Sequence, residues 1–197
     1  MERIEGLFAA MRAASQDMEW PATEARDSGL EGGLESSLEH GLESAGDRAE
    51  RYAQAVSEAL CGYFRSSHAS LWLLDGEPGE YRLRCLGAHA VDGASDQRPV
   101  CEQRAYPGYF DALLSGGVFN CADAQADPRL SGLEPPPTWR AMLDVSGQIN
   151  GKTFGVIALG QRDAARVWTK REELDLRRAT AKACLHLHAL RNELETA

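Results

Sequence analysis

The chain has 197 residues and a formal net charge of −9, a length that suits one domain with its own core plus an extension. No Lys/Arg-rich run offsets the negative charge, so we expect no nucleic-acid partner. No apolar stretch approaches the ~20 residues of a membrane-spanning helix, and the first residues lack the apolar core of a signal peptide. We therefore expect a cytoplasmic protein with no membrane partner.

Residues 1–46 are predicted to form an N-terminal extension. Ile4, Leu7, Phe8 and Met11 recur at helical spacing, which predicts a short amphipathic helix that docks on a partner or on the domain's own surface. From Leu30 the sequence LEGGLESSLEHGLESA repeats Leu-Glu at every fourth residue. Its glycines disfavour a helix, so two readings stay open: an acidic linker, or a helix that needs a partner surface.

Residues 47–197 are predicted to form one α+β domain. The first element is a helix over residues 47–64, with Asp47 as its N-cap and Glu50 completing a capping box. ASLWLLD and YRLRCLGAHAV then form a hairpin, because both are strand-like and turn residues separate them. YPGYFDALLSGG predicts a short helix that ends at Gly116–Gly117.

The remaining elements follow in the same alternation. VFNCADA predicts a strand that leads into an irregular loop, because Pro135, Pro136 and Pro137 fit neither a helix nor a central strand. AMLDVSGQI and KTFGVIALGQ predict a second hairpin across Asn150–Gly151, a strong turn signal. Thr169 and Glu172 form a capping box that opens a helix toward the C-terminus.

This order of elements resembles that of the GAF family, and specific phrases carry the resemblance. SLWLLD, YPGYFDAL, DAQADPR, AMLDVSGQINGKTFGV and WTKRE are similar, in order, to bacterial GAF domains found with histidine kinases and diguanylate cyclases. The resemblance covers about Asp47 to Leu190. It implies a central antiparallel sheet, with the terminal helices packed together on one face and a loop-covered pocket on the other.

The sequence departs from the family pattern at two places. Ser146–Gly147 stands where family members usually carry a proline, and Gly160–Gln161 stands within the segment where many relatives have a C-x-E-H-like stretch. Ligand contacts that relatives make there are therefore not carried over to this chain.

The pocket face that the resemblance implies combines aromatic, apolar and a few charged side chains, as small-molecule sites do. The candidate ligand-binding residues are Trp72, Tyr106, Tyr109, Phe110, Asp123, Trp139, Arg140, Met142 and Asp144. Arg140 would pair with an anionic group of a ligand. In the alternative reading the aromatics are ordinary core, and Asp127 and Arg129 shape a turn. The sequence identifies no ligand or cofactor.

Metal and thiol chemistry receive less support. Asp123 and Asp127 provide too few oxygens for a Ca²⁺ site, and His186 and His188 point to different faces of their helix. The odd number of scattered cysteines favours buried thiols; they are Cys61, Cys85, Cys101, Cys121 and Cys184. One GAF branch reduces free methionine sulfoxide with cysteines, and that activity stays an alternative if the fold gathers Cys85, Cys101 and Cys121.

We expect a non-catalytic sensory or regulatory domain that binds a small molecule or a partner and signals through its terminal helices. A scaffold with a filled pocket is the alternative. The chain carries no kinase, cyclase or DNA-binding signature, so the effector is another protein or an output domain outside this chain.

The last helix carries two apolar stripes, Leu174, Ala181 and Leu185 on one side and Leu176, Ala179, Ala183, Leu187, Leu190 and Leu194 on another. One stripe can pack on the sheet and the other on a second subunit. We therefore expect a homodimer through the helices of residues 47–65 and 169–195. Alternatively, the second stripe covers only the N-terminal extension.

Overall fold

The computed structural model describes residues 2–16, 45–93, 100–130 and 139–196. The Leu-Glu repeat and the three consecutive prolines lie outside the described residues. The elements are α1 (Glu2–Gln16), α2 (Ala45–Phe64), β1 (His68–Asp75), β2 (Arg82–Ala90), β3 (Val100–Glu102), α3 (Pro107–Gly116), β4 (Val118–Cys121), η1 (Pro128–Leu130), β5 (Ala141–Ile149), β6 (Lys152–Gln161) and α4 (Lys170–Thr196). None of the described helices is long and apolar enough to cross a membrane.

The strands form one antiparallel sheet of six strands in the order β3-β2-β1-β6-β5-β4. Both predicted hairpins, β1–β2 and β5–β6, are confirmed. Asn150 and Gly151 join the second hairpin with positive φ angles of 51° and 76°, as a type I′ turn requires. The short edge strand β3 was not predicted, because its three residues lie in a mixed polar stretch without alternation.

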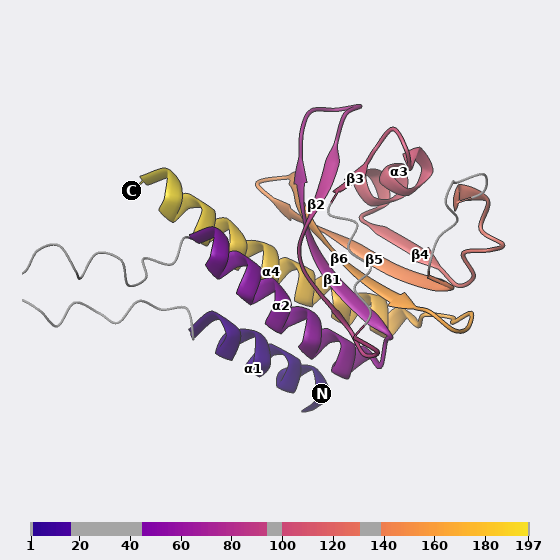
Figure 1. Cartoon of the computed structure of the whole chain (residues 1–197), viewed down its shortest axis with the longest axis horizontal. Helices are drawn as coiled ribbons and strands as arrows, with labels where there is room; N and C mark the ends of the chain where they lie inside the picture. The colour runs from indigo at the N-terminus through magenta and orange to yellow at the C-terminus, as the bar shows by residue number, and fades with distance from the viewer. Residues whose placement is uncertain (1, 17–44, 94–99, 131–138, 197) are drawn as a thin grey trace, which may run out of the picture.

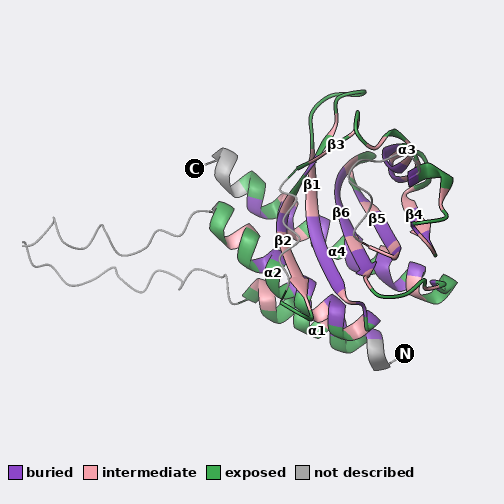
Figure 2. Cartoon of the chain, turned by 45° about the vertical axis from the view of Figure 1, so that its right-hand side comes forward, coloured by how far each residue is buried: buried purple, intermediate pink, exposed green. Residues whose placement is uncertain are grey.

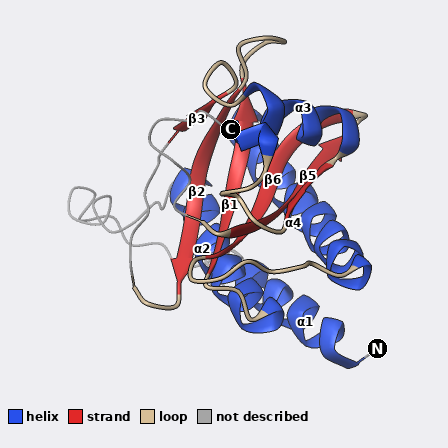
Figure 3. Cartoon of the chain, turned by 90° about the vertical axis from the view of Figure 1, so that its right-hand side faces the viewer, coloured by secondary structure: helices blue, strands red, loops and turns tan. Residues whose placement is uncertain are grey.

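The two faces of the sheet are covered differently. The helices α2 and α4 pack on one face of the sheet, α1 packs against these two helices, and α3 lies on the other face (Figure 1, Figure 3). Side chains along β1 alternate accordingly: Leu71 and Leu73 pack among the helices, whereas Trp72 and Leu74 pack on the α3 side. This agrees with the prediction of an α+β domain whose terminal helices share one face of the sheet.

Two glycines let the helices approach the sheet closely. A Cβ on Gly87 would lie 2.6 Å from the backbone nitrogen of Gln54 in α2. A Cβ on Gly147 would lie 2.4 Å from Cys184 Sγ in α4. Real Cβ atoms do not approach other atoms this closely, so any larger residue would push the helices away. Ser146–Gly147, which departs from the pattern of the resembled family, therefore lies where α4 packs against β5.

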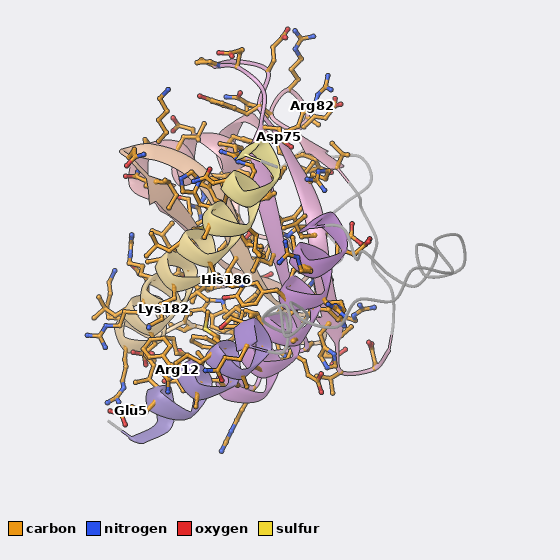
Figure 4. All side chains as sticks on the ribbon, turned by 90° about the vertical axis from the view of Figure 1, so that its left-hand side faces the viewer. Glu5, Arg12, Asp75, Arg82, Lys182 and His186 are labelled. Atoms are coloured by element: carbon orange, nitrogen blue, oxygen red, sulfur yellow. The ribbon has the colours of Figure 1, made fainter. Side chains whose placement is uncertain are left out.

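The N-terminal helix α1 docks on the domain's own surface. Ile4, Leu7 and Met11 are buried, and the last two belong to the core cluster beneath α2 and α4. The Lys182 ammonium of α4 lies 4.8 Å from the centre of the Phe8 ring (Figure 4). The sequence left open whether this helix docks on a partner or on the domain's own surface. The structure shows the second, because the apolar face of α1 is buried against α2 and α4.

Helix termini agree with the sequence at α3 and α4 and differ at α2. In α4, Glu172 Oε2 accepts from the Thr169 backbone N–H at 2.8 Å, and the Glu172 N–H donates to Thr169 Oγ1 at 3.2 Å, which is the predicted capping box. Helix α3 ends at Gly117, which has a φ of 70°. The prediction of Asp47 as an N-cap is wrong, because α2 already includes Ala45 and Asp47 lies in its first turn.

The two stripes of α4 have different surroundings, which Figure 2 shows as buried and exposed sides of the helix. One stripe packs inside and comprises Leu176, Ala179, Ala183, Leu187 and Leu190. The side chain of Leu194 lies outside the described residues. On the other stripe Leu174 is 55% exposed and Leu185 is 62% exposed. The sheet, α2 and α1 therefore use one stripe, and the second remains on the surface.

Candidate functional site

The candidate site lies on the α3 side of the sheet, where β5 contributes alternate residues. Leu143 and Val145 point toward the helices on the opposite face, and Met142 packs in the α3-side cluster. Asp144 has the same parity as Met142 and reaches Tyr109 of α3. The strand thus places a carboxylate in the layer between the sheet and α3.

Asp144 and Tyr109 form a buried polar pair. The Tyr109 hydroxyl donates to Asp144 Oδ2 at 2.8 Å, and Asp144 has no exposed surface. Burial raises the pKa of Asp144 to about 7, which the Tyr109 hydroxyl and the Leu159 backbone amide oppose in part. Burial, with the Asp144 charge, also raises the pKa of Tyr109 well above its ordinary value.

One oxygen of this carboxyl group has no hydrogen-bond partner among the described residues. In the described part of the chain, Asp144 Oδ1 is buried and makes no hydrogen bond: the Leu159 backbone amide affects the pKa of the carboxyl group but does not meet hydrogen-bond geometry at Oδ1. Such an acceptor costs free energy, on the order of 1–3 kcal/mol for a neutral group and more for a charged one. The site therefore holds an unused hydrogen-bonding position next to an aromatic wall.

Aromatic and aliphatic side chains surround the pair. The Tyr109 ring lies edge-on to Phe119 of β4 and to Phe110, with centroid distances of 5.0 and 5.8 Å. The rest of the cluster includes Leu83, Leu113, Cys121, Ala124, Leu130 and Val156, with Trp72, Tyr106 and Met142 partly buried against it. Of the predicted site residues, the structure thus gathers Trp72, Tyr106, Tyr109, Phe110, Met142 and Asp144 around one cluster.

Asp123 and Arg140 are paired with each other. The Arg140 guanidinium donates to both carboxylate oxygens of Asp123, at 2.8 and 2.9 Å, and lowers the pKa of that carboxyl. Both side chains are about one-third exposed. The pair joins the end of β4 to the start of β5. The guanidinium predicted to meet an anionic ligand group therefore already has an intramolecular carboxylate.

Asp127 and Arg129 also pair with each other, as the turn-shaping alternative predicted. Arg129 lowers the pKa of Asp127 to about 2, and its guanidinium donates to the Asn120 carbonyl and lies over the Phe119 ring. No group of three or more metal-ligating side chains occurs among the described residues.

Trp139 lies at a separate position, at one end of β1 and β6. Its indole stacks on the His68 ring at 4.5 Å, and the Arg162 guanidinium lies 4.8 Å from its centre. A Cβ on Gly160 would come within 2.8 Å of this indole, so Gly160 leaves the space that Trp139 occupies. Sequence reasoning missed His68, although its even spacing from Trp72 along a strand places both on one face.

Four of the five cysteines are thiols whose pKa values are raised. Burial raises the pKa of Cys61 and Cys85 to about 11, and that of Cys121 and Cys184 to about 12. Cys101 on β3 and Cys121 on β4 belong to opposite edge strands of the sheet, and both pack in the α3-side cluster of described residues, which does not include Cys85. A raised pKa keeps a thiol protonated and poorly nucleophilic at neutral pH.

These features define an α+β domain with a mixed aromatic and carboxylate site beside its sheet. The GAF domain family model matches residues 48–185, so the chain belongs to the GAF family. GAF domains are in general sensory or regulatory domains. A comparison with curated proteins finds no match.

Solved structures of GAF domains share the fold. The chain is similar to the GAF domain of a phosphoenolpyruvate-protein phosphotransferase from Coxiella burnetii, with a TM-score of 0.62, 14% identity, and 96% and 97% of the two chains covered. It is also similar to the blue-light absorbing form of the PixJ GAF domain of Thermosynechococcus elongatus (TM-score 0.62, 16% identity, 79% and 95% covered). A free methionine-R-sulfoxide reductase from Thermoplasma acidophilum is similar as well (TM-score 0.60, 14% identity, 75% and 97% covered). At these identities the likeness concerns the fold alone.

Proposed function

We propose that this protein is a non-catalytic GAF-type regulatory domain in bacterial signal transduction that binds a small molecule on the α3 side of its sheet. The ligand presents an N–H or O–H donor to Asp144 and an apolar or aromatic body to the surrounding cluster. The observation that carries this proposal is the Oδ1 atom of the fully buried Asp144, which has no hydrogen-bond partner among the described residues.

A purely structural role explains Asp144 poorly. An apolar residue of similar size would fill the same space without a buried acceptor that lacks a donor. A carboxyl group retained at such a cost is typical of a binding site, where a ligand supplies the missing hydrogen bond. The neighbouring Tyr109 fixes one carboxylate oxygen and so orients the other.

The strand β5 offers a route from this site to the terminal helices. Asp144 lies on its α3 side, and Gly147, three positions along, contacts Cys184 of α4 on the opposite face. Because that contact leaves no spare room, a small shift of β5 on ligand binding changes how α4 sits on the sheet. The effector is then a partner protein or an output domain outside this chain.

The protonated thiols support the non-catalytic reading over a cysteine-based reductase. A thiolate is the nucleophile in sulfoxide reduction, and burial raises the pKa of Cys85 and Cys121 to about 11 and 12. A homodimer through the α2 and α4 helices stays a prediction. Native mass spectrometry reports the subunit number together with any co-purifying ligand.

The test compares the wild type with Asp144→Leu. Native mass spectrometry and a thermal-shift screen of metabolites identify a ligand, whose affinity is then measured for both proteins. We expect Asp144→Leu to lose about tenfold or more in affinity while unfolding at an equal or higher temperature. Asp111→Asn is the matched control, because it removes an exposed carboxylate of α3 outside the cluster.

Equal affinities for wild type and Asp144→Leu would refute the proposal that the ligand donates a hydrogen bond to Asp144. A bare wild-type mass with no stabilising compound, together with a less stable Asp144→Leu, favours the scaffold alternative instead.

A further inference from the structure

The outer face of α4 is an amphipathic surface that the fold itself does not use. We define it by Arg171, Leu174, Arg178, Ala181, Lys182 and Leu185, which are all exposed and follow one another at helical spacing. Leu174 and Leu185 are two of the five large hydrophobic residues that stand out as exposed among the described residues. Exposed leucines at this spacing on one helix are typical of a docking surface.

The charges on this face have one sign. Arg171 and Arg178 reach Asp175 only at 3.8 and 3.7 Å, and Asp175 itself is buried. Lys182 lies over the Phe8 ring at the border with α1 (Figure 4). None of the exposed residues described between Arg171 and Asn192 is acidic. The surface therefore suits a partner that carries leucines and carboxylates.

A second copy of the same face does not meet this requirement. A symmetric pairing of two α4 helices through this face places Arg171, Arg178 and Lys182 on both sides of the interface, with no exposed carboxylate of α4 between them. Like charges opposite each other across an interface disfavour association. The predicted homodimer would therefore use other parts of α2 and α4.

The chain contains a segment with the complementary pattern. Residues 30–43 carry leucines at positions 30, 34, 38 and 42, each followed by a glutamate. No lysine or arginine occurs between Arg26 and Arg48. In a helix, a step of four residues overshoots one turn by ~40°, so leucines and glutamates form two adjacent stripes. The glycines weaken such a helix alone, so it depends on a partner surface.

The chain connectivity places the end of this segment near the C-terminal end of α4, and a helix over residues 30–43, ~21 Å long, would run from there along α4 toward Leu185 and Leu174. The segment ends just before Ala45, where α2 begins, and Figures 1 and 2 show the start of α2 and the C-terminal end of α4 at the same end of the molecule. A short tether of this kind gives an effective concentration of roughly millimolar, which favours binding within one chain.

We propose that residues 30–43 bind the outer face of α4 in the same chain, with their leucines against Leu174 and Leu185 and their glutamates paired with Arg171 and Arg178. The surface is then an interaction site for an acidic, leucine-bearing segment, separate from the ligand site on the other side of the sheet.

Hydrogen–deuterium exchange of the full chain tests this proposal. In the wild type, backbone amides of residues 30–43 should exchange roughly tenfold or more slowly than the intrinsic rates of the free sequence. Arg171→Glu with Arg178→Glu should remove that protection. Adding lysines in place of Glu31, Glu35, Glu39 and Glu43 to this double variant should restore it, because the charges are then exchanged across the contact.

Two controls separate docking from general charge or folding effects. Arg82→Glu with Arg104→Glu makes the same charge change at exposed sites on β2 and after β3, and should leave the protection intact. Protection of α4 inner-face amides such as Leu176 and Ala183 should be equal in all variants, which verifies that each folds.

Three results overturn the proposal. They are exchange of residues 30–43 at intrinsic rates in the wild type, protection unaffected by the α4 substitutions, and protection that rises with protein concentration. The last result would assign the contact to a second copy rather than to the same chain.

Discussion

The pH dependence of stability is the most direct consequence of the buried Asp144. The folded protein holds this carboxyl at a pKa of about 7, compared with an ordinary value of 3.8. Between these two values the unfolded chain releases the proton while the folded chain keeps it. Asp144 therefore destabilises the fold progressively as the pH rises from about 4 to about 7, and the loss is complete above pH 8.

The size of the effect follows from the two pKa values. The difference between 3.8 and about 7 corresponds to on the order of 4 kcal/mol of unfolding free energy, as an upper bound. This sign is opposite to that of the ion-paired carboxyls. Arg140 and Arg129 lower the pKa of Asp123 and Asp127, so their contributions are present at neutral pH and are lost only in acid.

Urea unfolding of the wild type and Asp144→Asn from pH 4.5 to 8.5 measures the contribution. The asparagine variant keeps the shape but cannot ionise, and subtracting the two curves removes the titration of all other groups. The wild type should lose several kcal/mol relative to the variant across this range. Tyr109→Phe removes the hydrogen bond that lowers the Asp144 pKa, so its transition should move to higher pH.

A flat difference between wild type and Asp144→Asn would refute the reasoning. It would mean that Asp144 ionises near its ordinary pKa, and hence that water or a polar neighbour reaches Oδ1 in the ligand-free protein.

Three further predictions concern the helix layer and the thiols. Gly147→Ala should cost about 1–3 kcal/mol of unfolding free energy because its Cβ would meet Cys184 Sγ at 2.4 Å, and adding Cys184→Ala should recover part of this loss. Gly62→Ala in α2 has open space around it and should instead stabilise by about 0.4–1 kcal/mol in the same urea assay. Cys85, with a pKa raised to about 11, should react with a disulfide reagent at pH 7 about 100-fold more slowly than in the urea-unfolded chain. A native Cys85 as fast as the unfolded one would argue for a catalytic thiol.

The elements of the fold could be predicted from local patterns. The hairpin at Asn150–Gly151, the end of α3 near Gly117 and the capping box of Thr169 and Glu172 are set by residues close together in sequence. Local backbone preference and nearby hydrogen bonds decide such features, so the sequence is informative about them. The edge strand β3 escaped prediction because long-range pairing with β2, rather than its own pattern, makes it a strand.

The sequence predicted which residues belong to the candidate site, but only the fold shows which of them contact one another. Tyr109 and Asp144 lie far apart in sequence, and their contact depends on α3 crossing over β5. Arg140 was predicted to meet a ligand, but its bidentate contact with Asp123 arises where β4 and β5 pair. Trp139 was predicted to line the pocket. In the structure its indole instead packs over Gly160, which has no side chain to block it, and stacks on His68.

By itself, the sequence determined the family, the order of helices and strands and the two faces of the sheet, because apolar periodicity and turn residues encode these locally. The tertiary structure alone decided which polar groups were satisfied. Whether a carboxylate finds a partner depends on side chains brought from distant strands and on burial, which changes a pKa without any change in the residue. Asp123 follows β4 and Asp144 lies in the neighbouring β5, yet Asp123 pairs with an arginine, whereas Asp144 is buried with one oxygen that has no partner among the described residues.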